Sequence, residues 1–513
     1  MILYHIITNY HLLNAVVHAS QQEGEKVLLY PEWLQDKIAG NNYLQFFFDK
    51  IIAIDANFRF RYSKEYTAEY FFNILGDFDK FTDIYVWGAQ FSFGISLSEQ
   101  NKRFSFCEEG CGILSRSYIL KDIDKKDPLK CNFVDLADDL GLYSGENSNI
   151  KQVLCNQKAQ IDKFEFQGNV IDWDIVDEIT KMDAIDRIRL MEFFGVNMTI
   201  SIPDNSVIVL TQHFSNLFML SFEEHILIYQ LLVDYFFYNK ELVIKVHPND
   251  LMYYDVLFPK SVVVREKFPA EFLPFIFEGQ PLKVATIGST ATFSLKGHYE
   301  NIFELDSRYE RDFHFTNKYY ASVCIAKALN KNISYLSANE ILLKKLADSV
   351  GFTNAVAESL METSYNENVL VVDDVVAKGE VGRQEIINLL ENGNHYRCVI
   401  LINSKKDYCW YDYYHRELWN DIIPVVLKKE VHQPQSEDFY ADIEDEVIYV
   451  YSKNKELLNM VREMEMEKDL PHTGITVRKE ILTAEQERIK MLEGILEATE
   501  KRLLYYINKE KEQ

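Results

Sequence analysis

The sequence predicts an α/β fold with two Rossmann-like domains, an additional C-terminal α/β domain and a terminal helix. Its 513 residues exceed what one hydrophobic core usually holds. Short β-rich runs alternate with helical stretches, and this pattern restarts after the Pro-containing segment at residues 202–204. A further group of strands begins near residue 336. The expected domains are 1–204, 205–335, 336–472 and the helix 473–513.

The first domain is expected to form a parallel sheet with crossover helices. Residues 1–7 are an apolar strand, and a helix with apolar residues at helical spacing follows it. The stretch from about 120 to 200 is more polar and is expected to be helical. Further strands are expected at 26–30, 50–55, 83–88 and 103–110.

The second domain repeats this organisation. A helix is expected over 221–239, because Ser221 and Glu224 form a capping-box pattern ahead of an apolar run. Strands are expected at 206–212, 242–250, 261–266 and 283–289.

The third region has its own strands and ends in a charged helix. Apolar residues near heptad positions in 473–513 are typical of a coiled coil or docking helix, which would make the chain a homo-oligomer. A helix packed on its own domain fits equally well, and both alternatives stay open. The strands expected in this region begin a strand–turn–helix at 368–390 and continue at 398–404, 422–429 and 446–452.

Composition excludes several classes of function. The net charge of −25 repels phosphate backbones, so nucleic acid is not an expected partner. The seven cysteines are scattered and odd in number, as in a reducing compartment. The sequence shows neither a signal peptide nor an apolar run of about 18 residues, which predicts a cytoplasmic protein. Peripheral association with the inner face of the membrane stays open.

Four polar features follow expected strands, at the edge where open α/β sheets bind ligands. The first is Cys107-Glu108-Glu109-Gly110, where a carboxylate with a raised pKa would suit a general base. Acidic pairs before Gly are more often plain turns. The second is Lys245-Val246-His247-Pro248, where His247 could neutralise a departing phosphate. A histidine that caps a backbone carbonyl is the simpler interpretation.

The other two features involve a carboxylate and a pair of hydroxyls. Glu271 follows Phe268-Pro269 and could accept hydrogen bonds from two ribose hydroxyls, although an acid at a helix start explains it as well. Gly288-Ser289-Thr290 leads from a strand into a helix, which suits either an anion site or an ordinary N-cap.

In this order, the four features resemble those of bacterial sialyltransferases of glycosyltransferase family 52 and the related capsule polysialyltransferases. Glu108-Glu109-Gly110 resembles their acidic motif, His247-Pro248 their His-Pro motif, and Ser289-Thr290 their Ser/Thr pair. The opening segment 8–15 is similar to the family's first helix. The resemblance covers roughly residues 1–330 and implies the GT-B fold, with an acceptor-side first domain and a nucleotide-sugar-binding second domain.

The resemblance also implies an inverting, metal-independent sialyl transfer from CMP-sialic acid to a cell-surface glycan of lipooligosaccharide or capsule type. Glu108, or less readily Glu109, would deprotonate the acceptor hydroxyl, and His247 would donate to the leaving phosphate. None of the four features contains an Asp-x-Asp metal clamp, and no cofactor beyond the donor substrate is expected. The implied nucleotide contacts are Lys245 with Pro248, Glu271, and Gly288 with Ser289 and Thr290.

This sequence departs from the family in some positions. The acidic motif is Glu-Glu where Glu-Asp or Asp-Asp is more usual, and Thr290 replaces a second Ser. Alternatives are another donor, such as CMP-Kdo or a UDP-sugar, and a non-catalytic glycan-assembly protein.

The third region lies outside that resemblance. Residues 369–381 are similar to the PRPP-binding strand of type I phosphoribosyltransferases and to the first strand of receiver domains. Lys378 and Glu380 stand where Thr and Gly are expected, and no Asp ends the strand 398–404. A strand whose two acids cap the next helix is the simpler interpretation.

Overall fold

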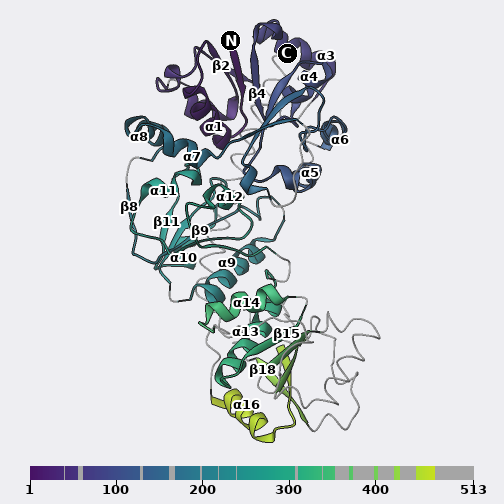
Figure 1. Cartoon of the computed structure of the whole chain (residues 1–513), viewed down its shortest axis with the longest axis vertical. Coiled ribbons are helices and arrows are strands. Elements are labelled where there is room, and N and C mark those ends of the chain that lie inside the picture. The colour runs from purple at the N-terminus through teal and green to yellow at the C-terminus, as the bar shows by residue number, and fades with distance from the viewer. Residues whose placement is uncertain are drawn as a thin grey trace, which may run out of the picture. The chain divides into compact units, whose positions relative to one another are not determined.

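The computed structural model divides the chain into two compact units (Figure 1). The first unit comprises Met1–Gln212, Leu242–Pro248 and Val262–Phe303. The second comprises His213–Glu241, Asn249–Ser261 and Glu304–Gln513. The residues that the structure describes are 1–39, 41–55, 62–127, 131–160, 168–196, 199–217, 219–238, 240–306, 310–337, 339–352, 369–373, 398–402, 421–427 and 446–467.

A seven-stranded sheet with the order β3-β2-β1-β4-β5-β6-β7 forms the first half of the first unit. Every neighbouring pair is parallel. This order contains the 3-2-1-4-5-6 arrangement of the doubly wound Rossmann fold. The strands are β1 (Ile2–His5), β2 (Lys26–Pro31), β3 (Lys50–Ile54), β4 (Asp83–Trp87), β5 (Phe104–Cys107), β6 (Ile150–Cys155) and β7 (Asn169–Asp172).

Two of these strands fall where the sequence predicted helices, so the prediction for 120–200 was partly wrong. In β6, Lys151 and Gln152 interrupt the apolar run, and β7 is a short edge strand with exposed ends. Polar interruption and edge position both weaken the β signal of a sequence. The rest of the stretch is largely helical, with α5 (Ser117–Lys126), α6 (Cys131–Asp139), α7 (Ile175–Lys181) and α8 (Ala184–Phe193).

A second sheet with the order β11-β10-β9-β13-β14 completes the first unit, and β11, β10, β9 and β13 are parallel. This order repeats the Rossmann pattern, so the predicted fold class, two Rossmann-like sheets in a GT-B arrangement, is confirmed. A small parallel pair, β8 (Ile200–Ser201) with β12 (Phe277–Glu278), lies in the same unit. The five strands are β9 (Val207–Leu210), β10 (Leu242–Lys245), β11 (Val262–Val264), β13 (Lys283–Thr286) and β14 (Ile302–Glu304).

One hydrophobic core joins the two sheets of the first unit. Tyr4 and Leu12 from the first half belong to the same buried cluster as Ile208 and Leu295 from the second. Leu12 lies on α1 (Asn9–Ser20), and Leu295 ends α12 (Ala291–Leu295). Both sheets therefore belong to one compact unit, and distances between their edges are defined.

The second unit is built on a mixed sheet with the order β15-β16-β17-β19-β18. The first three strands are parallel, and β19 is antiparallel to both of its neighbours. Helix α13 (Phe313–Ala328) packs against α14 (Glu340–Ser349) and α9 (Phe222–Phe236). The strands are β15 (Ile333–Leu336), β16 (Val369–Asp373), β17 (Cys398–Ile402), β18 (Ile422–Leu427) and β19 (Glu446–Tyr451).

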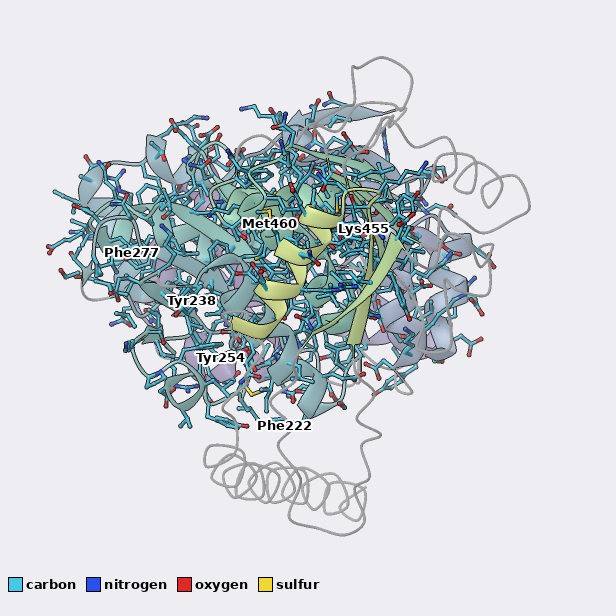
Figure 2. All side chains as sticks on the ribbon, turned by 90° about the horizontal axis from the view of Figure 1, so that it is seen from below. Phe222, Tyr238, Tyr254, Phe277, Lys455 and Met460 are labelled. Carbon is cyan, nitrogen blue, oxygen red and sulfur yellow. The ribbon has the colours of Figure 1, made fainter. Side chains whose placement is uncertain are left out.

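One helix terminus in this unit has the cap that the sequence predicts. The Ser221 hydroxyl accepts from the Glu224 N–H, and the Glu224 carboxylate accepts from the Ser221 N–H, which confirms the predicted capping box at α9. Helix α16 (Lys455–Glu467) buries Leu458 and Val461 and leaves Met460 exposed (Figure 2).

The predicted C-terminal helix 473–513 lies outside the described residues. Among the residues that the structure does describe, none of the helices is both long and apolar enough to span a bilayer. The described cysteines Cys107, Cys111, Cys155, Cys324 and Cys398 are free thiols.

Candidate functional site

The carboxyl-terminal edges of the two parallel sheets of the first unit meet. Gly110 follows β5, and a Cβ built on it would lie 3.5 Å from the Thr290 hydroxyl, just ahead of α12. The Cys111 thiol, in the same turn, is hydrogen-bonded to the Ser294 side chain on α12. The acidic motif of one sheet therefore lies directly beside the Ser/Thr pair of the other.

Glu108 is the more buried acid of the pair, with 5% exposure. Its Oε1 accepts from the Leu114 N–H at 3.2 Å and the Gln160 amide at 2.8 Å, and its Oε2 accepts from the Asn156 N–H at 3.2 Å. Burial raises the pKa of Glu108 to about 7, although these hydrogen bonds act in the opposite direction. The carboxylate thus joins the turn after β5 to the turn after β6.

Gly112 allows the turn after β5 to lie against the turn after β6. Its φ is +72°, and an added Cβ would lie 2.6 Å from the Ala159 carbonyl oxygen. Only glycine adopts this backbone conformation readily at such a close approach. The position of the Glu108 carboxylate therefore depends on a residue without a side chain.

Glu109 has a different environment, although it is the next residue. Its side chain is 19% exposed, and its Oε2 lies 3.5 Å from Nε2 of the fully buried His11. The same His11 nitrogen lies 2.9 Å from the Glu109 main-chain oxygen. Gly88, at the end of β4, is also adjacent, since its missing Cβ would lie 3.4 Å from Oε2. Glu109 therefore lies at the point where the strand order of the first sheet reverses, between β1 and β4.

His247 and the Ser/Thr pair lie at the corresponding edge of the second sheet. Strands β10 and β13 both pair with β9, so their ends are about 10 Å apart. The His247 N–H donates to the Thr211 hydroxyl at 3.0 Å, which fixes the end of β10 beside the end of β9. His247 itself is partly exposed.

Ser289 and Thr290 differ in their contacts. Ser289 is 7% exposed, and its hydroxyl accepts from the N–H of Ala291, the first residue of the short helix α12, at 3.4 Å, whereas Thr290 is the N-cap residue. Gly288 precedes Ser289 with a φ of +88°, which glycine adopts at little cost. Thr290 is partly exposed and faces Gly110.

The two predicted nucleotide contacts, Lys245 and Glu271, are each 4% exposed. The Lys245 ammonium donates to the main-chain oxygens of Val246 and Glu266, and burial lowers its pKa to about 8. Glu271 accepts from the Ser294 hydroxyl at 3.0 Å, and burial raises its pKa. Both groups stabilise the second sheet's edge in this structure.

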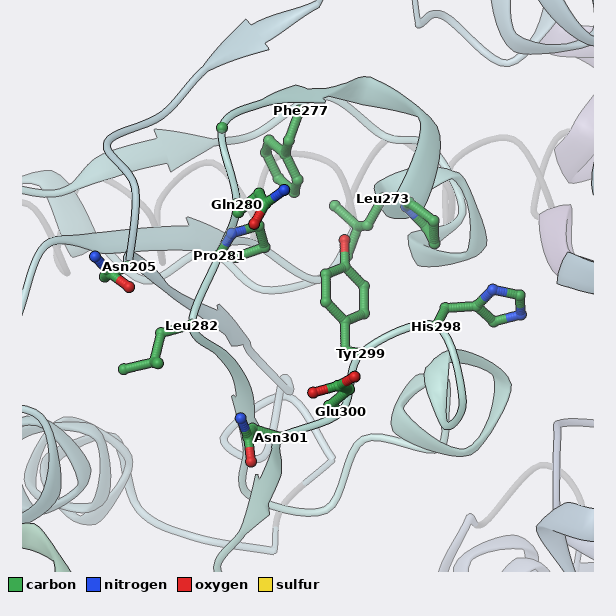
Figure 3. Close-up of a pocket in the computed structure, with 12 residues that line it drawn as sticks. Asn205, Leu273, Phe277, Gln280, Pro281, Leu282, His298, Tyr299, Glu300 and Asn301 are labelled. Carbon is green, nitrogen blue, oxygen red and sulfur yellow. The ribbon is translucent and has the colours of Figure 1, made fainter.

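A cavity of about 480 Å³ lies at the opposite, amino-terminal edge of the second sheet (Figure 3). Its wall includes Asn205, which leads into β9, Leu282, which leads into β13, and Asn301, which leads into β14. Tyr299 points into it in Figure 3. None of the residues that the sequence predicted for the site lines this cavity.

Within the described residues, one group has the spacing of a metal site: Asp174, Asp177 and His298. Asp174 already caps α7 by accepting from two N–H groups, and its other oxygen accepts from the Asn156 amide. A cation there would face the positive end of a helix. We therefore assign no metal to it, and it includes none of the predicted site residues.

In the third region, Asp373 ends β16 and is fully buried. It accepts from the Tyr319 hydroxyl at 2.6 Å and from the Ser337 hydroxyl. This carboxylate therefore joins β16 to α13 and to the end of β15; the helix that the acidic pair was expected to cap lies outside the described residues. Residues 374–397, which include Lys378 and Glu380, lie outside the described residues.

Sequence reasoning missed His11, Cys111, Ser294 and Arg116. The Arg116 guanidinium lies 3.9 Å from the Phe293 ring centroid on α12 and donates to the Gly112 carbonyl. These residues belong to the site only because the two sheet edges meet. The one local signal was the position of His11 in the first turn of the helix that follows the first strand, where Rossmann folds place ligand contacts.

No protein-family model matches the chain. An uncharacterized protein of Haemophilus influenzae is 28% identical over 152 residues, which are 29% of this chain and 49% of that protein. The chain thus spans about half the length of the curated relative it matches.

Among solved structures, the chain is similar to a sialyltransferase GT-B domain from Photobacterium damselae, with 10% identity, a TM-score of 0.36, and coverage of 70% of this chain and 100% of that one. An α-2,3-sialyltransferase from Photobacterium phosphoreum gives 12% identity, a TM-score of 0.39, and coverage of 69% and 97%. A UDP-GlcNAc 2-epimerase from Methanocaldococcus jannaschii gives 12% identity and a TM-score of 0.35. The match covers 60% of this chain and 89% of that one.

Proposed function

We propose that this chain is an inverting, metal-independent glycosyltransferase that moves sialic acid from CMP-sialic acid to a hydroxyl of a cell-surface glycan. One observation carries the proposal: the acidic motif and the Ser/Thr pair, 180 residues apart along the chain, lie side by side at two facing sheet edges, with Gly110 next to Thr290. A transferase of this kind needs a base for the acceptor and a clamp for the leaving phosphate, and it needs them on opposite sides of one cleft.

In this proposal, the acidic motif activates the acceptor hydroxyl, which attacks the anomeric carbon from the face opposite the phosphate. His247 donates to the phosphate as the bond to the sugar breaks, and the Ser289 and Thr290 hydroxyls hold its other oxygens. The edges touch in this structure, so the donor enters when they separate, and closure excludes water during transfer.

Lys245 and Glu271 are proposed to contact the cytosine and the ribose, with Pro248 and Gly288 shaping the same edge. Because both charged groups are buried, the nucleotide would have to compete with their present partners, above all the Ser294 hydroxyl on Glu271. Their contribution is therefore expected in donor affinity.

The test is a screen of nucleotide sugars with the purified protein, measuring the nucleotide released with and without glycan acceptors. Release of CMP from CMP-sialic acid supports the proposal. Nucleotide release from CMP-Kdo or a UDP-sugar alone would show that this compound, and not CMP-sialic acid, is the donor. If no nucleotide is released from any of them, a non-catalytic assembly protein is favoured.

Replacing His247 by Ala is expected to lower kcat by about 10²–10³-fold, because a donor to the developing negative charge is lost. His298→Ala is the matched control, since His298 lies in the same half of the unit but beyond α12. Equal activity of the two variants would contradict the role of His247. Cytoplasmic location at the inner membrane face and pairing of chains through 473–513 remain proposals.

A further inference from the structure

We propose that His11 is a positioning residue that holds Glu109 as the general base, while the neighbouring Glu108 serves as a buried structural carboxylate. This inference rests on the proposed glycosyl transfer and selects between the two acids. It also gives a role to His11, a residue of segment 8–15 to which the resemblance assigns none.

The hydrogen bonds of His11 fix its tautomer. The Ile7 N–H donates to Nδ1 at 3.2 Å, so Nδ1 holds a lone pair and carries no proton. In the neutral ring the proton must then lie on Nε2. That N–H donates to the Glu109 main-chain oxygen at 2.9 Å, and the carboxylate Oε2 lies 3.5 Å from the same nitrogen. His11 therefore holds the main chain of Glu109 and lies beside its carboxylate.

The ring is also held rigidly. His11 is fully buried in the first turn of α1, and its own N–H donates to the Thr8 hydroxyl that caps this helix. Its ring is inclined by 29° to the Trp87 ring at the end of β4, with the centroids 6.5 Å apart. A donor fixed by two neighbouring strands can orient a carboxylate without reorganising during the reaction.

Exposure separates the two acids. Oε2 of Glu109 is buried on the His11 side, yet the side chain is 19% exposed, so solvent reaches it through its other atoms. Glu108 is 5% exposed and uses both oxygens for three N–H donors of its own lobe. An acceptor hydroxyl could reach Glu109 from the side that solvent already reaches, whereas at Glu108 it would have to displace one of these three donors.

The step balances with His11 unchanged. The acceptor oxygen forms its bond to the anomeric carbon and gives its proton to the Glu109 carboxylate. The bond from the anomeric carbon to the phosphate oxygen breaks, and its electron pair leaves with CMP. His11 keeps its Nε2 proton throughout and acts only through Glu109.

Two substitutions separate the contacts of His11. In His11→Asn, the amide oxygen replaces Nδ1 and keeps an acceptor for Ile7, but the donor toward Glu109 is lost. In His11→Gln, the amide nitrogen reaches the Nε2 position and keeps that donor. We expect His11→Asn to lower kcat for transfer by about 10-fold, as for one lost hydrogen bond that positions Glu109, with unchanged donor KM. His11→Gln should recover most of this loss.

The controls are His18→Asn, a buried histidine of the same helix, and the double variant His11→Asn/Glu109→Gln. If His11 acts through Glu109, the double variant is no slower than Glu109→Gln alone. A kcat of His11→Asn equal to that of His18→Asn, or a fully additive double variant, overturns the inference. If the unaltered protein turns over no nucleotide sugar, the proposed function fails, and the role of Glu109 as a base fails with it.

Discussion

Replacing Glu108 by Gln tests whether this acid is a buried structural group. Burial raises its pKa from 4.5 to about 7. This difference corresponds to roughly 3 kcal/mol between the charged and neutral forms. Because the folded-state pKa lies above the unfolded one, the stabilising contribution is fully present below about pH 4.5. It is lost as the pH rises through about 7.

Glutamine occupies the same volume and does not titrate. Hydrogen exchange of the segments 110–116 and 154–160, which contain the amides that donate to Glu108, would measure the local free energy of opening. The protection of the variant relative to the unaltered protein should rise by about 10²-fold between pH 5 and pH 8, since only the unaltered protein ionises. At pH 5 the protection of these segments in the variant should be equal to or lower than in the unaltered protein, because the NH₂ group of the glutamine faces an N–H donor.

Taking the ratio at each pH removes the intrinsic dependence of exchange on pH. Peptides from α9, which belongs to the other unit, serve as an internal control and should show a ratio near one. A ratio for 110–116 and 154–160 that stays constant from pH 5 to pH 8 would show that Glu108 ionises without cost, and the structural role would be wrong.

Three further substitutions test the surroundings of the site and the N-terminal cap of α9 in the other unit. Gly112→Ala should lower the free energy of unfolding by about 1–3 kcal/mol, measured as a lower thermal midpoint. The reason is that φ at Gly112 is +72° and the added Cβ would lie 2.6 Å from the Ala159 oxygen. Lys245 has a pKa lowered to about 8, so the unaltered protein should gain stability relative to Lys245→Met as the pH rises from 8 toward 10, which calorimetry would follow. Ser221→Ala removes the capping box of α9 and should cost about 1 kcal/mol, measured as faster exchange in the first turn of that helix.

Much of the fold could be predicted because its central strands are nearly pure apolar runs. Residues of β1 and β9 are buried on both faces, and such strands leave the same signal wherever they pack. The edge at which the site would lie could also be predicted, because ligands bind at the carboxyl ends of parallel strands. Glu108, His247 and Ser289 each follow an apolar run closely enough for that rule to assign them to a sheet edge from the sequence alone.

The contacts that distinguish Glu108 from Glu109 could not be predicted. Two of the three donors to Glu108 come from Asn156 and Gln160, which follow β6, and the polar residues within β6 concealed that strand. The partner of Glu109, His11, lies 98 residues away along the chain. Their proximity depends on the strand order β1-β4-β5, a property of the whole sheet that no local pattern contains.

The different environments of the two acids follow from the geometry of a strand end. Both acids follow Cys107, the last residue of β5, and their side chains contact the ends of different neighbouring strands. On one side of β5 lies the turn after β6, whose N–H groups require an acceptor, and Glu108 supplies it. On the other side lie β4 and the first turn of α1, where His11 offers a single N–H. The first acid thereby joins the turns after β5 and β6, and the second lies beside the end of β4 and the first turn of α1. Glu109 could not take the structural role of Glu108 unless β6 moved, because Asn156 and Gln160, which donate to Glu108, lie in the turn after β6.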